Sequence, residues 1–202
     1  QSWAGKEQGK KLVLLMPGSR LMEIDKMLPT LLAGAKLLKQ QLPDVQFAMP
    51  RAGTIPLTML QEKIAASGLD VKITEGHNYD LFSAADLALA TSGTVTLEAA
   101  LCGLPSVIVY RTSALNAFIA RLVINIPNIG LPNIVAGKTI MPELLQEDFT
   151  PEKLAKTAVE LLQPERQAQL QSDLEYMKKR LGEPGAVDRV AQLILKITEE
   201  KK

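Results

Sequence analysis

The sequence predicts an α/β fold: an open parallel sheet of about five or six strands with flanking helices. Short apolar runs alternate with longer segments whose apolar residues recur at helical spacing, which is typical of βαβ units. The clearest unit occupies residues 86–111, where strand, turn, helix and strand follow one another. Strands joined by such crossovers run parallel, so we expect them to be buried on both faces.

The central unit is delimited by its turn residues. An apolar run at residues 87–90 stops at Thr91-Ser92-Gly93-Thr94, and helical periodicity then continues from residue 95 to Gly103. Gly103 and Pro105 are typical of a helix end, and residues 106–110 form the next apolar run.

The segment before this unit predicts three strands and three helices in alternation. The strands are expected at residues 12–16, 45–49 and 71–73, and the helices at residues 24–41, 56–67 and 78–85. Pro29 lies inside the first helical pattern, so we expect it to kink that helix or split it in two.

After Arg111 the pattern changes from regular alternation to helices and one long loop. Residues 115–123 have an apolar helical face, and residues 126–137 form an apolar segment without clear periodicity, which we interpret as a loop packed over a site. Helices are then expected at residues 142–146, 150–163, 166–181 and 186–202, with Thr150 as an N-cap.

Three regions are expected along the chain. Residues 1–11 are polar and lack an initiator Met, which favours a linker that follows a further segment; residues 12–163 form the main domain. Residues 164–202 form C-terminal helices, and the last has an apolar face that needs a partner. That partner could be the main domain, an N-terminal half outside this chain or the second subunit of a homodimer.

Composition excludes several classes of function. A net charge of +1 with interspersed signs, and 4% aromatic residues, argue against nucleic-acid binding. The single cysteine, Cys102, lies in an apolar helical pattern and favours a buried thiol in a reducing compartment. The single histidine, His77, excludes a His-rich metal cluster, and no apolar run reaches the length of a membrane span.

Two turns at the carboxyl ends of predicted strands are candidate anion sites. One contains Ser19 and Arg20, and the other contains Ser92, Gly93 and Thr94. Ligands of open parallel sheets bind at this edge, where helix N-termini present free N–H groups and positive potential. Neither turn matches the dinucleotide-binding or P-loop fingerprint. The alternatives are an ordinary N-cap in the second turn and, in the first, a surface ion pair between Arg20 and Glu23.

Three segments together resemble the lipid-A-disaccharide synthase family, glycosyltransferases of the GT-B architecture with two Rossmann-like domains. The segments are LLMPGSRLMEI at residues 14–24, SGTVTLEAALCGLPSVIVYR at residues 92–111, and IGLPNIVAGKTIMPELLQEDFTPEKLA at residues 129–155. The third is the most specific, because turns like the first two occur in several GT-B families. The resemblance covers the chain from about residue 11 onward and corresponds to the C-terminal, nucleotide-sugar-binding half.

The resemblance implies a hexosyltransferase of lipid A biosynthesis, and hence of lipopolysaccharide. Such enzymes transfer 2,3-diacylglucosamine from its UDP derivative to 2,3-diacylglucosamine 1-phosphate, a lipid-linked acceptor, and release UDP. The general base of the family belongs to the N-terminal half, so this half alone is expected to be inactive. Neither a cofactor nor a metal is expected. The implied location is cytoplasmic, peripheral on the inner face of the cytoplasmic membrane, where residues 115–123 could contact lipid.

The resemblance also implies a set of UDP-sugar-binding residues. They are Ser19, Arg20, Ser92, Gly93, Thr94, Glu98, Arg111, Asn133 and Glu143. The first two would contact phosphate, the next three would form the diphosphate turn, and Glu98 would accept hydrogen bonds from the ribose hydroxyls. From the residues alone, Glu98 could equally be a surface carboxylate that complements the helix dipole. Two other functions stay open: a UDP-N-acetylglucosamine epimerase of the same architecture, and a non-catalytic interaction module.

Overall fold

The computed structural model describes residues 6–7, 9–112, 127–183 and 185–199, and it contains one six-stranded parallel sheet. The strand order is β3-β2-β1-β4-β5-β6, so the direction in which strands are added to the sheet reverses between β1 and β4. The strands are β1 (Leu12–Met16), β2 (Gln46–Pro50), β3 (Lys72–Thr74), β4 (Leu87–Thr91), β5 (Ser106–Tyr110) and β6 (Glu143–Leu145). The predicted parallel α/β sheet of about six strands is confirmed.

The carboxyl ends of the two central strands lie side by side, as predicted. Met16 pairs with Ala90 in the register of β1 and β4. The turns that follow these strands therefore meet at the switch point of the strand order, where ligands of open α/β sheets bind.

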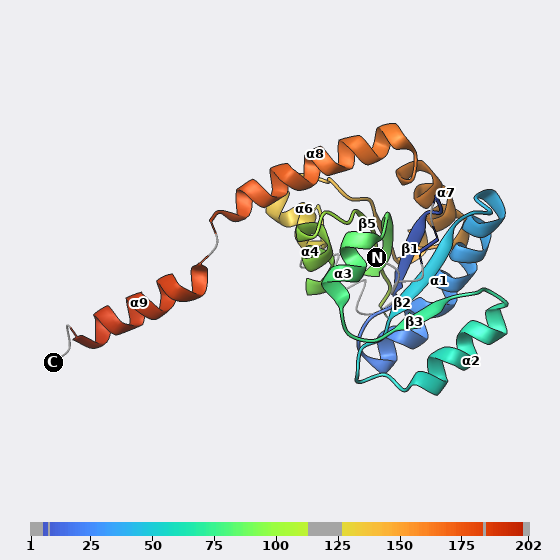
Figure 1. Cartoon of the computed structure of the whole chain (residues 1–202), viewed down its shortest axis with the longest axis horizontal. Helices are drawn as coiled ribbons and strands as arrows, with labels where there is room; N and C mark the ends of the chain where they lie inside the picture. The colour runs from blue at the N-terminus through green and yellow to red at the C-terminus, as the bar shows by residue number, and fades with distance from the viewer. Residues whose placement is uncertain (1–5, 8, 113–126, 184, 200–202) are drawn as a thin grey trace.

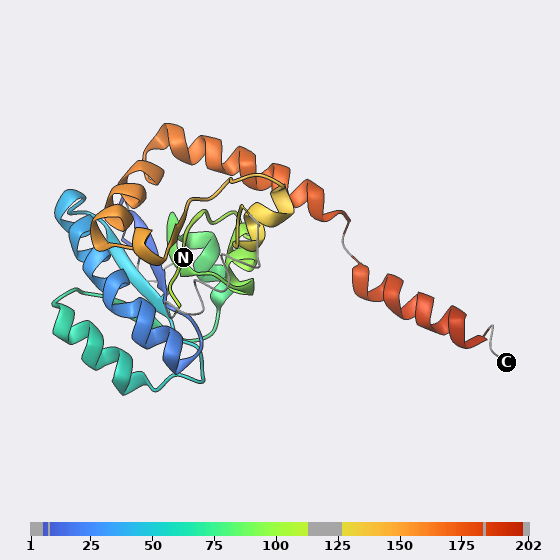
Figure 2. The same ribbon diagram turned by 180° about the vertical axis from the view of Figure 1, so that it is seen from behind.

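Helices cover both faces of the sheet (Figures 1 and 2). The described helices are α1 (Leu21–Gln41), α2 (Leu57–Ser67), α3 (Asn78–Ala84), α4 (Thr94–Leu101), α6 (Leu131–Ala136), α7 (Pro151–Leu161), α8 (Pro164–Leu181) and α9 (Ala186–Glu199). Alternate residues of β1 belong to different core clusters: Val13 and Leu15 pack with α1, α2 and α7, whereas Leu14 and Met16 pack with α3 and α4. This alternation follows from the two-residue repeat of a strand buried on both faces.

Helix α1 continues through Pro29, so of the two expected effects of this residue, a kink or a split, the split is wrong. The helix buries a long apolar stripe that includes Leu28 and Leu31, both fully buried, and this packing offsets the backbone hydrogen bond that Pro29 removes. Gly34 lets α7 approach closely, because a Cβ there would lie 2.6 Å from Leu154 Cδ2.

Two short elements near the end of the sheet differ from the sequence predictions. The segment predicted as a loop contains helix α6, and the helix predicted at residues 142–146 is instead strand β6 followed by a 3₁₀ turn, η1 (Gln146–Asp148). Helix α6 has Pro132 in its first turn and Gly137 in the left-handed conformation at its end, and buried Asn133 joins it to the next segment by accepting hydrogen bonds from Ile140 N and Met141 N and donating one to Met141 O. Pairing of β6 with β5 explains the second difference. The helix expected at residues 115–123 lies outside the described residues.

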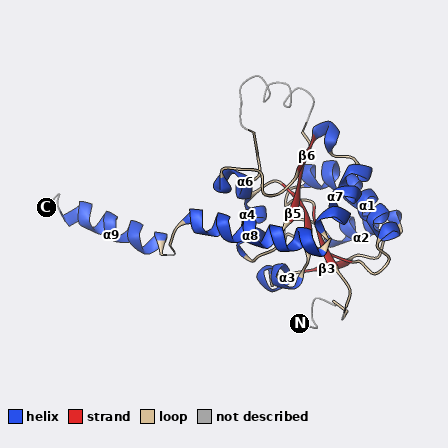
Figure 3. Ribbon diagram, turned by 90° about the horizontal axis from the view of Figure 1, so that it is seen from above, coloured by secondary structure: helices blue, strands red, loops and turns tan. Residues whose placement is uncertain are grey.

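The C-terminal helices differ in their contacts. Helix α8 buries Leu170, Leu174 and Met177 in the core, whereas α9 extends away from the sheet and keeps its apolar side chains exposed (Figures 1 and 3). Val187, for example, is 81% exposed. None of the helices in the described part of the chain has the length and apolarity that a membrane crossing requires.

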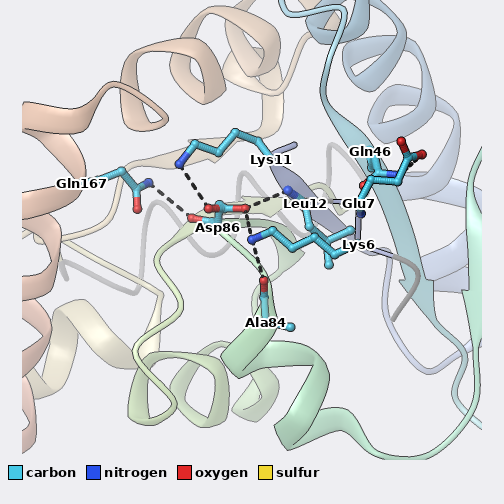
Figure 4. A network of polar contacts seen from close by, with 8 residues as sticks. All are labelled: Lys6, Glu7, Lys11, Leu12, Gln46, Ala84, Asp86 and Gln167. Carbon is cyan, nitrogen blue, oxygen red and sulfur yellow. Dashed lines mark hydrogen bonds and ion pairs between the residues drawn. The ribbon is translucent and has the colours of Figure 1, made fainter. Parts of the chain in front are cut away.

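A polar cluster around Asp86 joins the segment before β1 to the start of β4, at the amino edge of the sheet (Figure 4). The Asp86 carboxylate accepts hydrogen bonds from Lys6 Nζ at 2.8 Å, Lys11 Nζ at 3.2 Å and Leu12 N at 2.8 Å. Burial alone would raise the pKa of Asp86, but the hydrogen bonds from Lys6 and the Leu12 backbone hold this pKa below its ordinary value.

Candidate functional site

A cavity of about 520 Å³ opens at the carboxyl edge of the sheet, between the ends of β1, β2 and β4 and the helices that follow them. Six of the predicted site residues line it. They are Ser19, Arg20, Ser92, Gly93, Thr94 and Glu98. The topology therefore brings the two predicted turns into one cavity, although more than 70 residues separate them in the sequence.

The N-terminus of α4 is open toward this cavity. No side chain caps it, and no described residue accepts a hydrogen bond from the backbone N–H groups of Gly93, Thr94 or Val95. These N–H groups and the helix dipole make the turn suitable for an anion. The side chain of Ser92 donates a hydrogen bond of 3.4 Å to Ile129 O, which connects the turn to the segment before α6.

Gly93 has no structural need to be glycine within the described protein. Its φ of 168° is extended backbone that any residue adopts, and a Cβ at this position would meet nothing within 4 Å. The side chain of any other residue would therefore project into free space. Glycine at this position keeps the N–H groups accessible to a ligand.

The N-cap residue of α1, Arg20, is bound by a carboxylate of the same helix. Glu23 Oε2 accepts hydrogen bonds from Ser19 N and Arg20 N at 2.9 and 3.2 Å, and Glu23 Oε1 accepts one from Arg20 Nη1 at 2.8 Å. The bond to Arg20 N is half of a capping box, and Arg20 has no acceptor to supply the other half. The ion pair between Arg20 and Glu23 that the sequence left as an alternative is therefore present.

Glu98 lies one turn into α4, is half-buried and lines the cavity. No described side chain donates a hydrogen bond to its carboxylate or forms an ion pair with it within 4.0 Å. A carboxylate that faces a cavity without a partner can accept hydrogen bonds from a ligand. Its position near the helix N-terminus also suits the dipole, so both interpretations of Glu98 fit this geometry.

Three of the predicted site residues do not line the cavity, and their side chains bind other parts of the protein. The Arg111 guanidinium donates to Thr30 Oγ1 at 3.2 Å and to Phe149 O, and lies over the Phe149 ring. It thereby connects the end of β5 to α1 and to the start of α7.

Asn133 and Glu143 hold the segment around α6 in place. The Glu143 carboxylate accepts hydrogen bonds from Ile129 N, Gly130 N and Asn133 Nδ2, at 2.9, 3.0 and 2.7 Å. Glu143 therefore binds the N-cap N–H of α6, Gly130 N, in the way that Glu23 binds that of α1, Arg20 N. Because Ser92 contacts Ile129, this network also supports the turn at Gly93.

The cavity is also lined by residues that were not predicted as site residues. They include Arg51, Asn78, Phe82 and Thr91, which follow or end strands or lie on α3. Arg51 pairs with Glu75, and Thr91 Oγ1 is buried without a hydrogen-bond partner among the described residues. Arg51 and Thr91 were predictable from the sequence, because they stand at the carboxyl ends of β2 and β4, where ligands of open parallel sheets bind.

The family model described as lipid-A-disaccharide synthetase matches residues 3–197. A lipid-A-disaccharide synthase of Syntrophus aciditrophicus (strain SB) is 41% identical over 190 residues, which cover 93% of this chain and 50% of the relative. The synthase of Geobacter sulfurreducens is 38% identical over 194 residues, which cover 96% of this chain and 50% of the relative. The chain thus spans about half the length of the curated relatives it matches.

Solved structures show the same fold at low sequence identity. The UDP-GlcNAc 2-epimerase from Neisseria meningitidis bound to UDP-GlcNAc gives a TM-score of 0.62 at 16% identity, covering 97% of this chain and 47% of that one. WaaG, a glycosyltransferase involved in lipopolysaccharide biosynthesis, gives a TM-score of 0.58 at 21% identity, covering 86% of this chain and 44% of that one. These likenesses concern the fold, and they confirm the Rossmann-like class predicted for half of a GT-B glycosyltransferase.

Proposed function

This chain belongs to the lipid-A-disaccharide synthetase family, and we propose on that basis that its cavity binds the UDP-sugar donor of a glycosyl transfer. The donor would be UDP-2,3-diacylglucosamine and the acceptor 2,3-diacylglucosamine 1-phosphate. The products would be UDP and a β-1,6-linked disaccharide. The family membership supports this reaction, and the cavity supports the donor as the part of it that this chain binds.

The observation that carries the proposal is the open N-terminus of α4 in a cavity that also contains Arg20 and Glu98. The diphosphate would accept hydrogen bonds from the N–H groups of the Gly93 turn, and the Arg20 guanidinium would add a second positive group. Negative charge on the diphosphate increases as the bond to the sugar breaks. Donors already in position stabilise this charge without reorganisation, which lowers the barrier to transfer.

Glu98 would bind the ribose. Its carboxylate has two oxygens, which can accept hydrogen bonds from the two hydroxyls of a ribose, and no described group occupies them. The base would then lie against irregular backbone at the edge of the cavity, where uracil can be distinguished from adenine by its hydrogen-bonding edge. We therefore expect UDP to bind more tightly than ADP.

Transfer itself is proposed for the whole protein, because this chain spans about half of its relatives. The family's general base would come from the other half, together with the acceptor site. The acylated substrates favour a peripheral position on the inner face of the cytoplasmic membrane. The exposed apolar face of α9 could contribute to a homodimer or contact the other half. Gel filtration and vesicle flotation of the whole protein would test these two expectations.

Calorimetric titration of the chain with UDP and with ADP tests the donor site. We expect saturable binding of UDP and weaker binding of ADP. Equal affinity for the two nucleotides would contradict the base assignment, and the absence of UDP binding would favour the non-catalytic module. Product analysis of the whole protein separates transfer from epimerisation, since an epimerase would convert the UDP-sugar without a lipid acceptor.

A further inference from the structure

Glu23 is a negatively charged side chain at the wall of a cavity to which we assign a diphosphate. Like charges repel, so a carboxylate in this position should weaken diphosphate binding unless it has another effect. Its contacts indicate that effect, because the Glu23 carboxylate accepts its hydrogen bonds from Ser19 and Arg20 among the described residues, and both of these residues line the cavity.

The turn between β1 and α1 is shaped around the Glu23 carboxylate. Gly18 has a φ of +116°, and a Cβ there would lie 2.4 Å from Glu23 Oε2. Both the backbone conformation and the space beside Glu23 therefore require glycine at this position. On its other side the turn is held by Thr54, whose hydroxyl donates to Ser19 O at 2.7 Å.

The Arg20 side chain needs such support, because it is 80% exposed. A long exposed arginine samples many rotamers, and a ligand that fixes one of them loses affinity through this ordering. Glu23 Oε1 holds the guanidinium at 2.8 Å before any ligand is present. Glu23 Oε2 meanwhile accepts hydrogen bonds from the N–H groups of Ser19 and Arg20, whereas the N–H groups of Gly93 and Thr94 across the cavity have no described acceptor.

We propose that Glu23 is a positioning residue of the donor site, which holds the Arg20 guanidinium toward the diphosphate and directs the phosphates to the N-terminus of α4. This inference rests on the proposed function, since it requires a diphosphate in the cavity. Simple electrostatics predicts that removal of the negative charge strengthens diphosphate binding, whereas this inference predicts that the removal weakens it.

Glu23→Gln separates the two roles of this side chain. The amide oxygen can still accept hydrogen bonds from the turn, whereas the amide NH₂ that replaces the other oxygen cannot accept one from Arg20 Nη1. Asp25→Asn is the matched control, because it removes the same charge from the same helix. Asp25 pairs with Lys63, outside the cavity, at 3.1 Å. Both variants and the wild-type chain are titrated with UDP and with uridine, and their thermal unfolding is recorded without ligand.

We expect Glu23→Gln to bind UDP about tenfold more weakly than wild type, with uridine affinity within about twofold and an unfolding midpoint within about 2 °C. Asp25→Asn should match wild type for both ligands. In the double variant Arg20→Ala/Glu23→Gln, UDP affinity should equal that of Arg20→Ala alone, because Glu23 acts through Arg20.

Unchanged or tighter UDP binding by Glu23→Gln would overturn the inference, and so would a double variant in which the two losses multiply. An equal loss of UDP and uridine affinity would also overturn it, since this would indicate general damage to the fold. If the wild-type chain fails to bind UDP, the proposed function fails and the inference fails with it. Wild-type binding without an effect of Glu23→Gln overturns the inference alone.

Discussion

At the amino edge of the sheet, the Asp86 carboxylate accepts hydrogen bonds from two lysines and from the Leu12 backbone. At the carboxyl edge, the N–H groups at the start of α4 have no described acceptor, and the carboxylate of Glu98 has no described donor. Both edges belong to the same parallel sheet, so the fold alone does not dictate this difference. Groups that stabilise the protein are paired within it, whereas groups left open are available to a ligand.

The same difference between paired and open groups is found within the carboxyl edge. The carboxylates of Glu23 and Glu143 accept hydrogen bonds from the N-cap N–H groups of α1 and α6, Arg20 N and Gly130 N, whereas the N-cap N–H of α4, Gly93 N, has no described acceptor. An unfilled helix start costs stability, because its N–H groups lose hydrogen bonds that a cap would supply. The chain supplies such an acceptor for the N-cap N–H of each of the two flanking helices, and not for that of α4. We therefore interpret the open start of α4 as functional. We predict that variants at the amino edge change the free energy of unfolding, whereas variants at the carboxyl edge change UDP affinity.

The largest effect on ligand binding is expected from Glu98→Gln. An amide can accept only through one oxygen, so UDP binding should weaken by about 1.5 to 3 kcal/mol, the range for hydrogen bonds to a charged group. The free energy of unfolding should stay within about 0.5 kcal/mol of wild type, since no described side chain pairs with Glu98. Calorimetry and urea unfolding measure the two quantities. Unchanged affinity with lowered stability would show that Glu98 only complements the helix dipole.

The largest effect on stability is expected at the opposite edge. Asp86→Ala leaves Leu12 N and two lysines without their acceptor and should lower the free energy of unfolding by about 2 kcal/mol. UDP affinity should not change, because Asp86 lies at the edge of the sheet opposite the cavity. Urea unfolding gives the first quantity and titration the second. A loss of UDP affinity as large as the loss of stability would contradict the separation of the two edges.

The contribution of Asp86 should also depend on pH. Its pKa is lowered in the folded protein, so the stabilisation is present above the pKa of the unfolded carboxyl and is lost as the pH falls through the folded pKa. Asp86→Asn lacks this contribution at every pH. The free energy of unfolding of both proteins is measured near pH 6 and near pH 3. The difference between wild type and Asp86→Asn should be smaller at the lower pH. Asp173 also has a lowered pKa, but it is present in both proteins, so its contribution to the pH dependence cancels in the difference between their free energies of unfolding. A difference independent of pH would contradict the assignment.

Much of the site could be predicted because parallel strands place their carboxyl ends at one edge. Strands β1 and β5 have the predicted bounds, and the turns at Arg20 and Gly93 line one cavity. Non-local hydrogen bonds were not predictable in this way. The side chain of Asn133 organises residues 140 and 141, and three-residue β6 exists only through its pairing with β5. The role of Glu23 depends on side-chain geometry that the spacing of residues 20 and 23 does not determine.

The most direct test of the account is to measure UDP affinity and the free energy of unfolding together for Gly93→Ala. The added methyl group has free space in the protein and an unstrained backbone, so the stability should be unchanged or should rise by less than about 1 kcal/mol. The same methyl group would occupy the position of the diphosphate, so UDP affinity should fall by about tenfold or more. Wild-type UDP affinity in this variant would contradict the claim that the open start of α4 receives the diphosphate.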